Sequence, residues 1–177
     1  MKTSLVRNIF AIFGLISFVF FISAGSYLVY KTTFGNTVQI NKATKKDVKF
    51  ILNWCELGDD KIERVVNSYV SQTGFTADHL DAYLIKVKDI DIEDLSHTKT
   101  GKWYRGDNLP DLLHDAVKFS TTFNSETPWF LNNDEILSSD SYIYPWYIGC
   151  NGISPSSVKL IILKPNLNLI YFKSVSI

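Results

Sequence analysis

The residues able to carry metal or phosphate chemistry are few and scattered along this chain. The three histidines, His79, His97 and His114, lie far apart, and neither a CxxC nor an HxxxH spacing occurs. Spacing therefore gives no support to a metal site, and none is expected. The sequence also lacks the Walker A and GxGxxG loops that commonly bind phosphate groups. Any chemistry must therefore come from residues outside these motifs.

The cysteine content allows one disulfide at most, because Cys55 and Cys150 are the only two cysteines. In an oxidising compartment these two could pair, close a long loop and stabilise the fold by a few kcal/mol. Two separate buried thiols are the alternative, and their spacing in the sequence does not distinguish the two arrangements.

The composition indicates a folded chain with an uneven charge distribution. The 177 residues are 46% hydrophobic and hold 18 basic and 18 acidic residues, which excludes a disordered polyelectrolyte. Residues 1–30 contain Lys2 and Arg7 and no acid, so 16 bases and 18 acids remain in residues 31–177, a net charge of −2. That mildly acidic body lacks the basic surface that nucleic-acid affinity requires, so nucleic acid is set aside as a partner.

An uncharged run of 23 residues occupies positions 8–30. As a helix rising about 1.5 Å per residue, it would cross a hydrocarbon core of roughly 30 Å. We expect residues 1–30 to be either a transmembrane helix that anchors the chain or a signal peptide cleaved near the small residues 23–26. Both interpretations place residues 31–177 outside the cytoplasm, secreted or membrane-anchored. Residues 31–43 show no hydrophobic period and are expected to form a linker.

Residues 44–177 are expected to form one α+β domain in which helices precede strands. The first predicted helix begins with a capping box at Thr44 and Asp47 and stops near Gly58, and a later one begins near Pro110. Helical spacing of apolar residues predicts four helices, with buried faces at 48–55, 62–69, 80–87 and 112–117. A short strand-like run at 102–106 precedes the last of these helices, and further strand-like runs follow it at 141–150, 157–163 and 167–177.

Four motifs follow one another in residues 59–177. They are Val66-Asn67-Ser68-Tyr69 at the start of residues 66–84, Trp103-Tyr104-Arg105-Gly106, Phe119-Ser120-Thr121-Thr122, and residues 161–177. In this order they resemble the exotoxin-type ADP-ribosyltransferases. The first resembles the helix pair that opens that family's domain, the second its first-strand Arg-Gly, the third its Ser-Thr-Ser strand and the last its closing strands.

The resemblance implies a fold of N-terminal helices followed by two packed antiparallel sheets. It also implies a secreted toxin-like enzyme, a glycosyltransferase in the broad sense, that takes NAD as its substrate and transfers ADP-ribose to a protein target. Arg105 would bind the NAD pyrophosphate bidentately. Ser120 would position the catalytic group, and Thr121 and Thr122 would continue the NAD-binding strand. A surface ion pair with Asp107 is the alternative role for Arg105, and a plain β-strand is the alternative for residues 119–122.

The family's catalytic Glu has no counterpart in this chain. The corresponding position lies near residues 156–159, which read Ser-Ser-Val-Lys, and no Glu follows Glu135. An active enzyme would need Asp134, Glu135 or Asp140 to stabilise the positive charge that develops on the ribose. The alternative hypothesis is a catalytically inactive member of the fold, acting as a membrane-tethered or secreted binding module. A third hypothesis is an anchored α+β envelope protein whose aromatic residues, Trp146 and Tyr147 among them, form core or a partner surface.

Overall fold

The computed structural model describes residues 2–34, 43–71, 78–97, 99 and 101–177. The chain divides into two compact units, Met1–Thr37 and Val38–Ile177, and each unit is described by itself. Most of the predicted linker at 31–43 lies outside the described residues, and residues 31–34 belong to the helix of the first unit.

The first unit contains one helix, α1, which spans Lys2–Phe34. Within it, Ile12–Tyr30 is long and apolar enough to cross a membrane, and a signal sequence would meet the same criterion. Almost all side chains of this stretch are exposed, so apolar groups face outward on every side of the helix. The expected N-terminal apolar segment is therefore confirmed as a helix.

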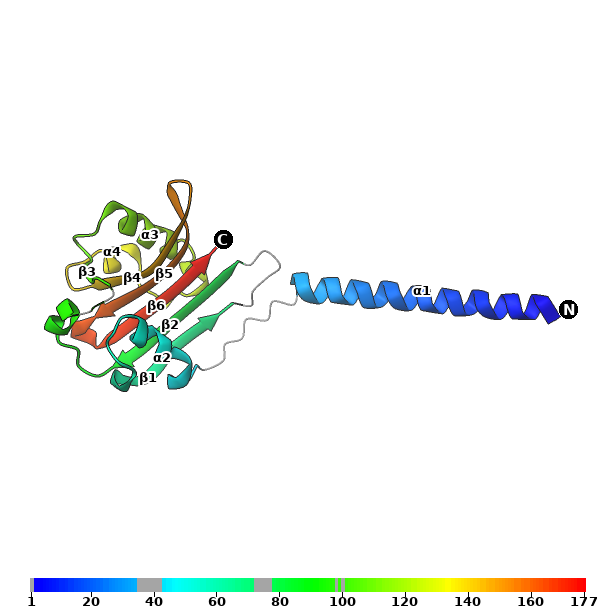
Figure 1. Cartoon of the computed structure of the whole chain (residues 1–177), viewed down its shortest axis with the longest axis horizontal. Coiled ribbons are helices and arrows are strands. Elements are labelled where there is room, and N and C mark those ends of the chain that lie inside the picture. Colours follow the sequence, from blue (N-terminus) through cyan, green and yellow to red (C-terminus); the bar gives the residue numbers. More distant parts are fainter. Residues whose placement is uncertain (1, 35–42, 72–77, 98, 100) are drawn as a thin grey trace. The chain divides into compact units, whose positions relative to one another are not determined.

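The second unit is built on a single six-stranded antiparallel sheet (Figure 1). Its strands are β1 (Ile62–Val70), β2 (His79–Val87), β3 (Tyr104–Arg105), β4 (Tyr142–Asn151), β5 (Ser154–Lys164) and β6 (Leu169–Ser176). They lie side by side in the order β1-β2-β6-β5-β4-β3, so β6 pairs with β2 on one side and β5 on the other. The expected α+β class is confirmed. The two packed sheets implied by the resemblance are not confirmed, because all strands of the described residues belong to one sheet.

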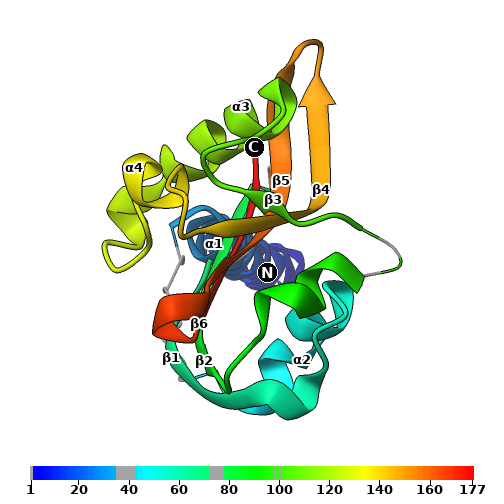
Figure 2. The same cartoon turned by 90° about the vertical axis from the view of Figure 1, so that its left-hand side faces the viewer.

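Helices cover both faces of this sheet (Figure 2). The helices are α2 (Lys45–Trp54), α3 (Asp111–Thr121) and α4 (Asn133–Ile136), and the 3-10 turns are η1 (Asp59–Lys61), η2 (Ile92–His97), η3 (Asn124–Glu126) and η4 (Pro165–Leu167). Helix α2 packs on one face, and α3 with α4 packs on the other. Since side chains alternate along a strand, each inner strand supplies both cores.

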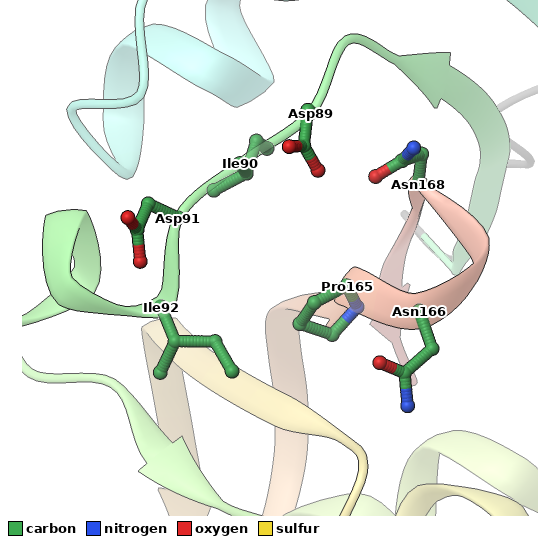
Figure 3. Close-up of a pocket in the computed structure, with 7 residues that line it drawn as sticks. All are labelled: Asp89, Ile90, Asp91, Ile92, Pro165, Asn166 and Asn168. Atoms are coloured by element: carbon green, nitrogen blue, oxygen red, sulfur yellow. The ribbon is translucent and has the colours of Figure 1, made fainter.

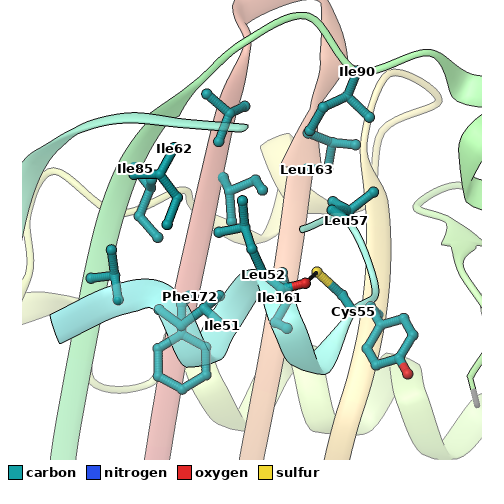
Figure 4. Close-up of a cluster of buried hydrophobic side chains, with 14 of the residues drawn as sticks. Ile51, Leu52, Cys55, Leu57, Ile62, Ile85, Ile90, Ile161, Leu163 and Phe172 are labelled. Atoms are coloured by element: carbon teal, nitrogen blue, oxygen red, sulfur yellow. Dashed lines mark hydrogen bonds between the residues drawn. The ribbon is translucent and has the colours of Figure 1, made fainter. Parts of the chain in front are cut away.

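The core beneath α2 consists of branched aliphatic and aromatic side chains (Figure 4). Helix α2 crosses the strands and buries Val48, Ile51 and Leu52 against them. On β6, Phe172 enters this core whereas Tyr171 enters the core under α3. Fully burying one such aliphatic side chain stabilises a fold by about 1.5–3 kcal/mol, so each core holds its helix on the sheet.

Helix α2 begins where the sequence predicts. The Asp47 carboxylate accepts hydrogen bonds from the backbone nitrogen of Thr44 at 2.8 Å and from its hydroxyl at 2.7 Å. This interaction fixes the first turn of the helix, and the bond lowers the pKa of Asp47 because it favours the ionised carboxylate. The helix ends at Trp54, and Glu56 takes a left-handed conformation with φ of 59° before Gly58 is reached.

Two predicted helices were wrong, because residues 62–69 and 80–87 form the strands β1 and β2. Strand β1 carries two β-bulges, where its register against β2 shifts near Arg64 and Asn67. Each bulge adds a residue to the strand, so buried positions recur at intervals longer than two and imitate a helical spacing. Strand β2 is buried on both faces and therefore shows no polar alternation.

The predicted strand at 119–122 was also wrong, because Ser120 and Thr121 belong to the last turn of α3. Ser120 lies three residues after Val117 on the same buried face of this helix, so the apolar stripe of the helix continues through it. Helix α3 follows Pro110, as expected. The expected strands at 141–150, 157–163 and 167–177 are confirmed with small shifts at their ends.

Candidate functional site

A row of polar side chains crosses the sheet just beyond the core that α2 covers. That core ends at a cross-strand set formed by Tyr83, Phe172 and Ile161. Asp81, Ser174 and Lys159 each lie two positions along the strand from Tyr83, Phe172 and Ile161, respectively. Asp81 pairs with Ser174, Ser174 pairs with Lys159, and Lys159 pairs with Tyr147 on β4. Because residues two apart share a face, these four lie on the α2 side of β2, β6, β5 and β4.

Two tryptophans border this polar row. Trp54, at the end of α2, stacks on Trp146 of β4, with ring centroids 4.8 Å apart and an interplanar angle of 2°. The Lys159 ammonium lies 5.5 Å from the centroid of the Trp54 ring, within the range of a cation–π interaction. A bulge between Pro145 and Tyr147 places Trp146 beside Tyr147, opposite Lys159. Trp146 remains 41% exposed and Tyr147 50% exposed.

We call this set the aromatic-polar patch. It consists of Trp54, His79, Asp81, Trp146, Tyr147 and Lys159. The imidazole Nε2 of His79 lies 3.0 Å from the buried hydroxyl of Ser174. This contact joins the first residue of β2 to β6. The patch therefore brings together a carboxylate, an ammonium, an imidazole and an aromatic surface.

Asp81 is the most unusual group in the patch. Its side chain is partly buried, and its carboxylate makes no hydrogen bond to any residue that the structure describes. Burial raises the pKa of its carboxyl, while the nearby charges of His79 and Lys159 oppose that rise. A partly desolvated carboxyl without a partner keeps its hydrogen-bonding capacity for another molecule.

The patch is better suited to binding than to nucleophilic catalysis. Ser174 and His79 have the separation of a nucleophile and its base. However, Ser174 is only 3% exposed and lies on β6, which is paired along both edges. The neighbouring backbone N–H groups are therefore used in the sheet and cannot form an oxyanion hole.

A second feature is a surface hollow of about 450 Å³ between the end of β2 and the β5–β6 turn (Figure 3). Asp89 and the amide of Asn168 point toward it from opposite sides. The buried Oδ1 of Asn168 accepts no hydrogen bond from the described residues. Asp91, also at the rim, turns its carboxylate away and accepts a bond from the Glu93 backbone nitrogen at 3.0 Å. Asp89 and Asn168 alone are too few for calcium, which takes six to eight oxygens.

Arg105 lies on the short edge strand β3 and is exposed. Its guanidinium forms an ion pair with Asp107, the residue named in the alternative interpretation of the sequence. The same carboxylate raises the pKa of Arg105. No hydrogen bond or ion pair between described residues joins Arg105 to Ser120, Thr121 or Thr122.

The hydroxyls predicted to bind NAD are used inside the fold. Ser120 is fully buried and donates to the backbone oxygen of Val117 at 2.7 Å. Thr121 and Thr122 both donate to the backbone oxygen of Lys118, as Ser and Thr commonly do near helix ends. These bonds satisfy the hydroxyls locally and leave no row of them along a strand.

Two of the three acids considered as substitutes for a catalytic Glu also have structural partners. Glu135 caps α4 by accepting from the Asn132 backbone nitrogen at 2.8 Å. Asp140 accepts from the buried ammonium of Lys164 at 2.8 Å, and this hydrogen bond lowers the pKa of Asp140. Both carboxylates therefore stabilise the connection from α4 to β4.

The cysteines are separate thiols in this structure. Cys55 is buried under α2 and Cys150 is exposed on β4, and both are free. Burial raises the pKa of the Cys55 thiol to about 12. The expected alternative of two unpaired thiols thus describes the structure, although only one of them is buried.

The sequence analysis missed His79, Asp81 and Lys159 as a group. The one signal for this group in the sequence was Asp81, an acid inside an otherwise apolar run. Because residues 80–87 were assigned to a helix, the pairing of Asp81 with its neighbours in the sheet could not be foreseen. Comparisons with protein families, with curated proteins and with solved structures found no match to this chain. The functional argument therefore rests on the geometry of the molecule itself.

Proposed function

We propose that residues 38–177 form a binding module whose ligand contacts the aromatic-polar patch, and that α1 delivers this module to a membrane or across it. The observation that carries the proposal is the partly buried side chain of Asp81, whose carboxylate makes no hydrogen bond to any described residue. It lies on the same face of the sheet as Trp146, which is three strands away on β4 and 41% exposed. A carboxylate in this position keeps its capacity to accept hydrogen bonds from a ligand.

The composition of the patch supports the same proposal. Elsewhere the face under α2 is apolar and closed by the helix, as the core around Ile51 and Phe172 shows. At the patch, Trp146 and Tyr147 remain in contact with solvent. Lys159 lies next to them on β5, and Asp81 lies two strands beyond Lys159 on β2. Aromatic residues with a few convergent polar groups are the usual lining of ligand sites.

Helix α1 supports delivery outside the cytoplasm. The segment Ile12–Tyr30 carries no charged residue, and the bases Lys2 and Arg7 precede it, which favours a cytoplasmic N-terminus. If the segment is uncleaved, it anchors the module. If cleavage occurs near residues 23–26, the module is released.

The ADP-ribosyltransferase hypothesis remains a prediction with less support than the binding module. Its two named residues, Arg105 and Ser120, have local partners. Glu135 and Asp140, two of the acids considered as substitutes for the catalytic Glu, stabilise the α4–β4 connection. Calorimetric titration of the full-length protein with NAD would test it. We expect no saturable heat and no release of nicotinamide, and either signal would restore the enzyme hypothesis.

The binding proposal is tested by ligand-observed NMR on the full-length protein in nanodiscs, screened against a library of small molecules. We expect library members whose binding is lost in Trp146→Ala and retained in Ile153→Ala. Ile153 is a suitable control because it is 95% exposed on the β4–β5 turn and lies outside the patch. If every ligand found binds equally to the Trp146→Ala variant, the patch is not the site.

The delivery proposal needs its own measurement. After expression of the full-length chain, the membrane fraction is washed with alkaline carbonate and the mass of the mature protein is determined. An intact protein that resists the wash identifies an anchor, and a protein shortened by about 25 residues in the soluble exported fraction identifies a signal peptide. Full-length protein that is soluble inside the cell contradicts both.

A further inference from the structure

We infer that the ligand of the aromatic-polar patch is a neutral saccharide, stacked on Trp146 and hydrogen-bonded by Asp81 and Lys159. This inference rests on the proposed function, because it names the ligand class of the same surface. It follows from the charge balance of the patch, from the position of its aromatic rings, and from the backbone of β4.

The charges of the patch give an ion of either sign no net attraction. Asp81 and Lys159 flank Ser174 on opposite sides, two strand spacings apart. An anion attracted by Lys159 is repelled by Asp81, and a cation attracted by Asp81 is repelled by Lys159, so the two contributions offset each other. A ligand rich in hydroxyl groups can donate to the carboxylate and accept from the ammonium without any net charge.

The aromatic part of the patch supplies a flat apolar surface. One face of Trp146 is stacked on Trp54 at 4.8 Å, which holds the indole in one orientation. Among the described residues Trp146 has no second ring partner, and 41% of its surface is exposed. The carbon-bound hydrogens on one face of a pyranose ring pack on such a surface, where the electron-rich ring face attracts them.

A peptide ligand fits this part of the sheet less well. Strand β3 pairs with only the first two residues of β4, so the outer edge of β4 continues past it through Pro145 and Trp146. Pro145 has no N–H to donate, and the bulge at Trp146 breaks the regular spacing of the edge. An extended peptide therefore cannot add to β4 as a further strand beside the patch.

The experiment uses full-length protein in nanodiscs made from lipids without sugar headgroups, with empty nanodiscs as the blank. Saturation-transfer NMR is recorded with three neutral tetrasaccharides, of N-acetylglucosamine, of β-linked glucose and of α-linked glucose. The tetramers of glucosamine and of galacturonic acid serve as cationic and anionic counterparts, and a capped Ala-Ser-Ala-Ser peptide represents the peptide class.

We expect at least one neutral tetrasaccharide to bind the wild-type protein and the Ile153→Ala control alike. In Trp146→Ala its affinity should fall by about tenfold or more, and Trp146→Phe should restore part of it because a ring is kept. In Asp81→Asn the neutral ligand should still bind, while the galacturonic acid tetramer should gain affinity because the repelling charge is gone. Circular dichroism checks that each variant is folded.

Two results overturn the inference in distinguishable ways. If no neutral saccharide binds, but the charged sugars, the peptide or members of the small-molecule library bind in a Trp146-dependent manner, the saccharide assignment fails and the binding module stands. If nothing binds in a Trp146-dependent manner, the inference and the proposed function both fail.

Discussion

The indole of Trp54 on α2 lies parallel to the indole of Trp146 on β4, 4.8 Å away and inclined by 2°. The two residues are separated by 92 positions in the sequence and meet only because α2 crosses the sheet toward β4. Trp54 also contacts Phe50 at 4.6 Å and Phe172 at 6.0 Å. Trp54 therefore joins the buried core to the exposed surface, whereas Trp146 belongs to the surface.

This difference predicts unequal effects on stability. Trp54→Ala removes contacts with Phe50, Phe172 and Trp146 and should lower the free energy of unfolding by about 3 kcal/mol. Trp146→Ala loses mainly the stacking and should cost about 1 kcal/mol. Urea denaturation followed by circular dichroism measures both. Equal losses for the two variants would mean that the stack, not the core, holds the end of α2.

We expect the free energy of unfolding to increase at alkaline pH because of the buried Lys173. Its side chain is fully buried, donates to Asn124 Oδ1 at 2.6 Å and lies 4.7 Å from the Phe130 ring. No carboxylate of the described residues is among its partners. Burial lowers the pKa of Lys173 to about 8, against 10.5 normally. Between these values the unfolded chain binds more protons than the folded one, so the free energy of unfolding increases with pH.

The Lys173→Met variant isolates this effect, because it lacks the titrating amine and keeps a long side chain. The difference in unfolding free energy, wild type minus variant, should increase by about 3 kcal/mol from pH 8 to pH 10.5 and stay flat below pH 7. Urea denaturation at several pH values measures it. Taking the difference removes the contribution of buried tyrosines such as Tyr171, whose raised pKa acts equally in both proteins. A constant difference across this range would contradict the assignment.

We expect that only glycine fits at position 106, in the connection from β3 to α3. A Cβ at this position would fall 2.6 Å from the backbone oxygen of Ser138 and still closer to that of Ile136. Backbone atoms cannot move aside cheaply, so Gly106→Ala should cost about 3 kcal/mol. Gly152→Ala is the matched control, because it meets open space and its φ of +66° adds only about 1 kcal/mol. Thermal denaturation measures both, and equal melting temperatures would contradict the close approach.

We expect the two free cysteines to react with a thiol reagent at different rates. In the native protein one thiol, Cys150, should react rapidly with a thiol reagent at pH 8, because Cys55 is buried and its pKa is about 12. After denaturation without reductant both should react. Cys150→Ser should abolish the fast phase only. If no thiol reacts in the denatured protein, the two cysteines pair after all.

The sequence identified those elements whose signals are local. Thr44 with Asp47 marked the start of α2, Pro110 marked the start of α3, and Asn151-Gly152 marked the β4–β5 turn. The hairpin of β1 and β2 was missed because bulges near Arg64 and Asn67 disturb the alternation that identifies a strand.

The aromatic-polar patch could not be predicted in the same way. It depends on the pairing of Asp81 with Ser174 and of Ser174 with Lys159, contacts between residues separated by 93 and 15 positions. The register between these strands depends on which face of each strand is buried and on the bulge at Trp146. Neither can be recognised in the sequence before the strands are paired. The ion pair of Arg105 with Asp107, two positions apart, was by contrast foreseeable.

The position of β6 has a consequence for how the domain acquires its structure during biosynthesis. It is sixth among the strands in chain order but lies between β2 and β5, and it supplies side chains to both cores. The hairpin of β1 and β2 therefore has no inner neighbour until the ribosome has made the chain through Ser176. Up to that moment neither layer of helices has a complete surface to pack on. A chain that closes its sheet so late keeps both of its cores open to solvent until its last strand has been made.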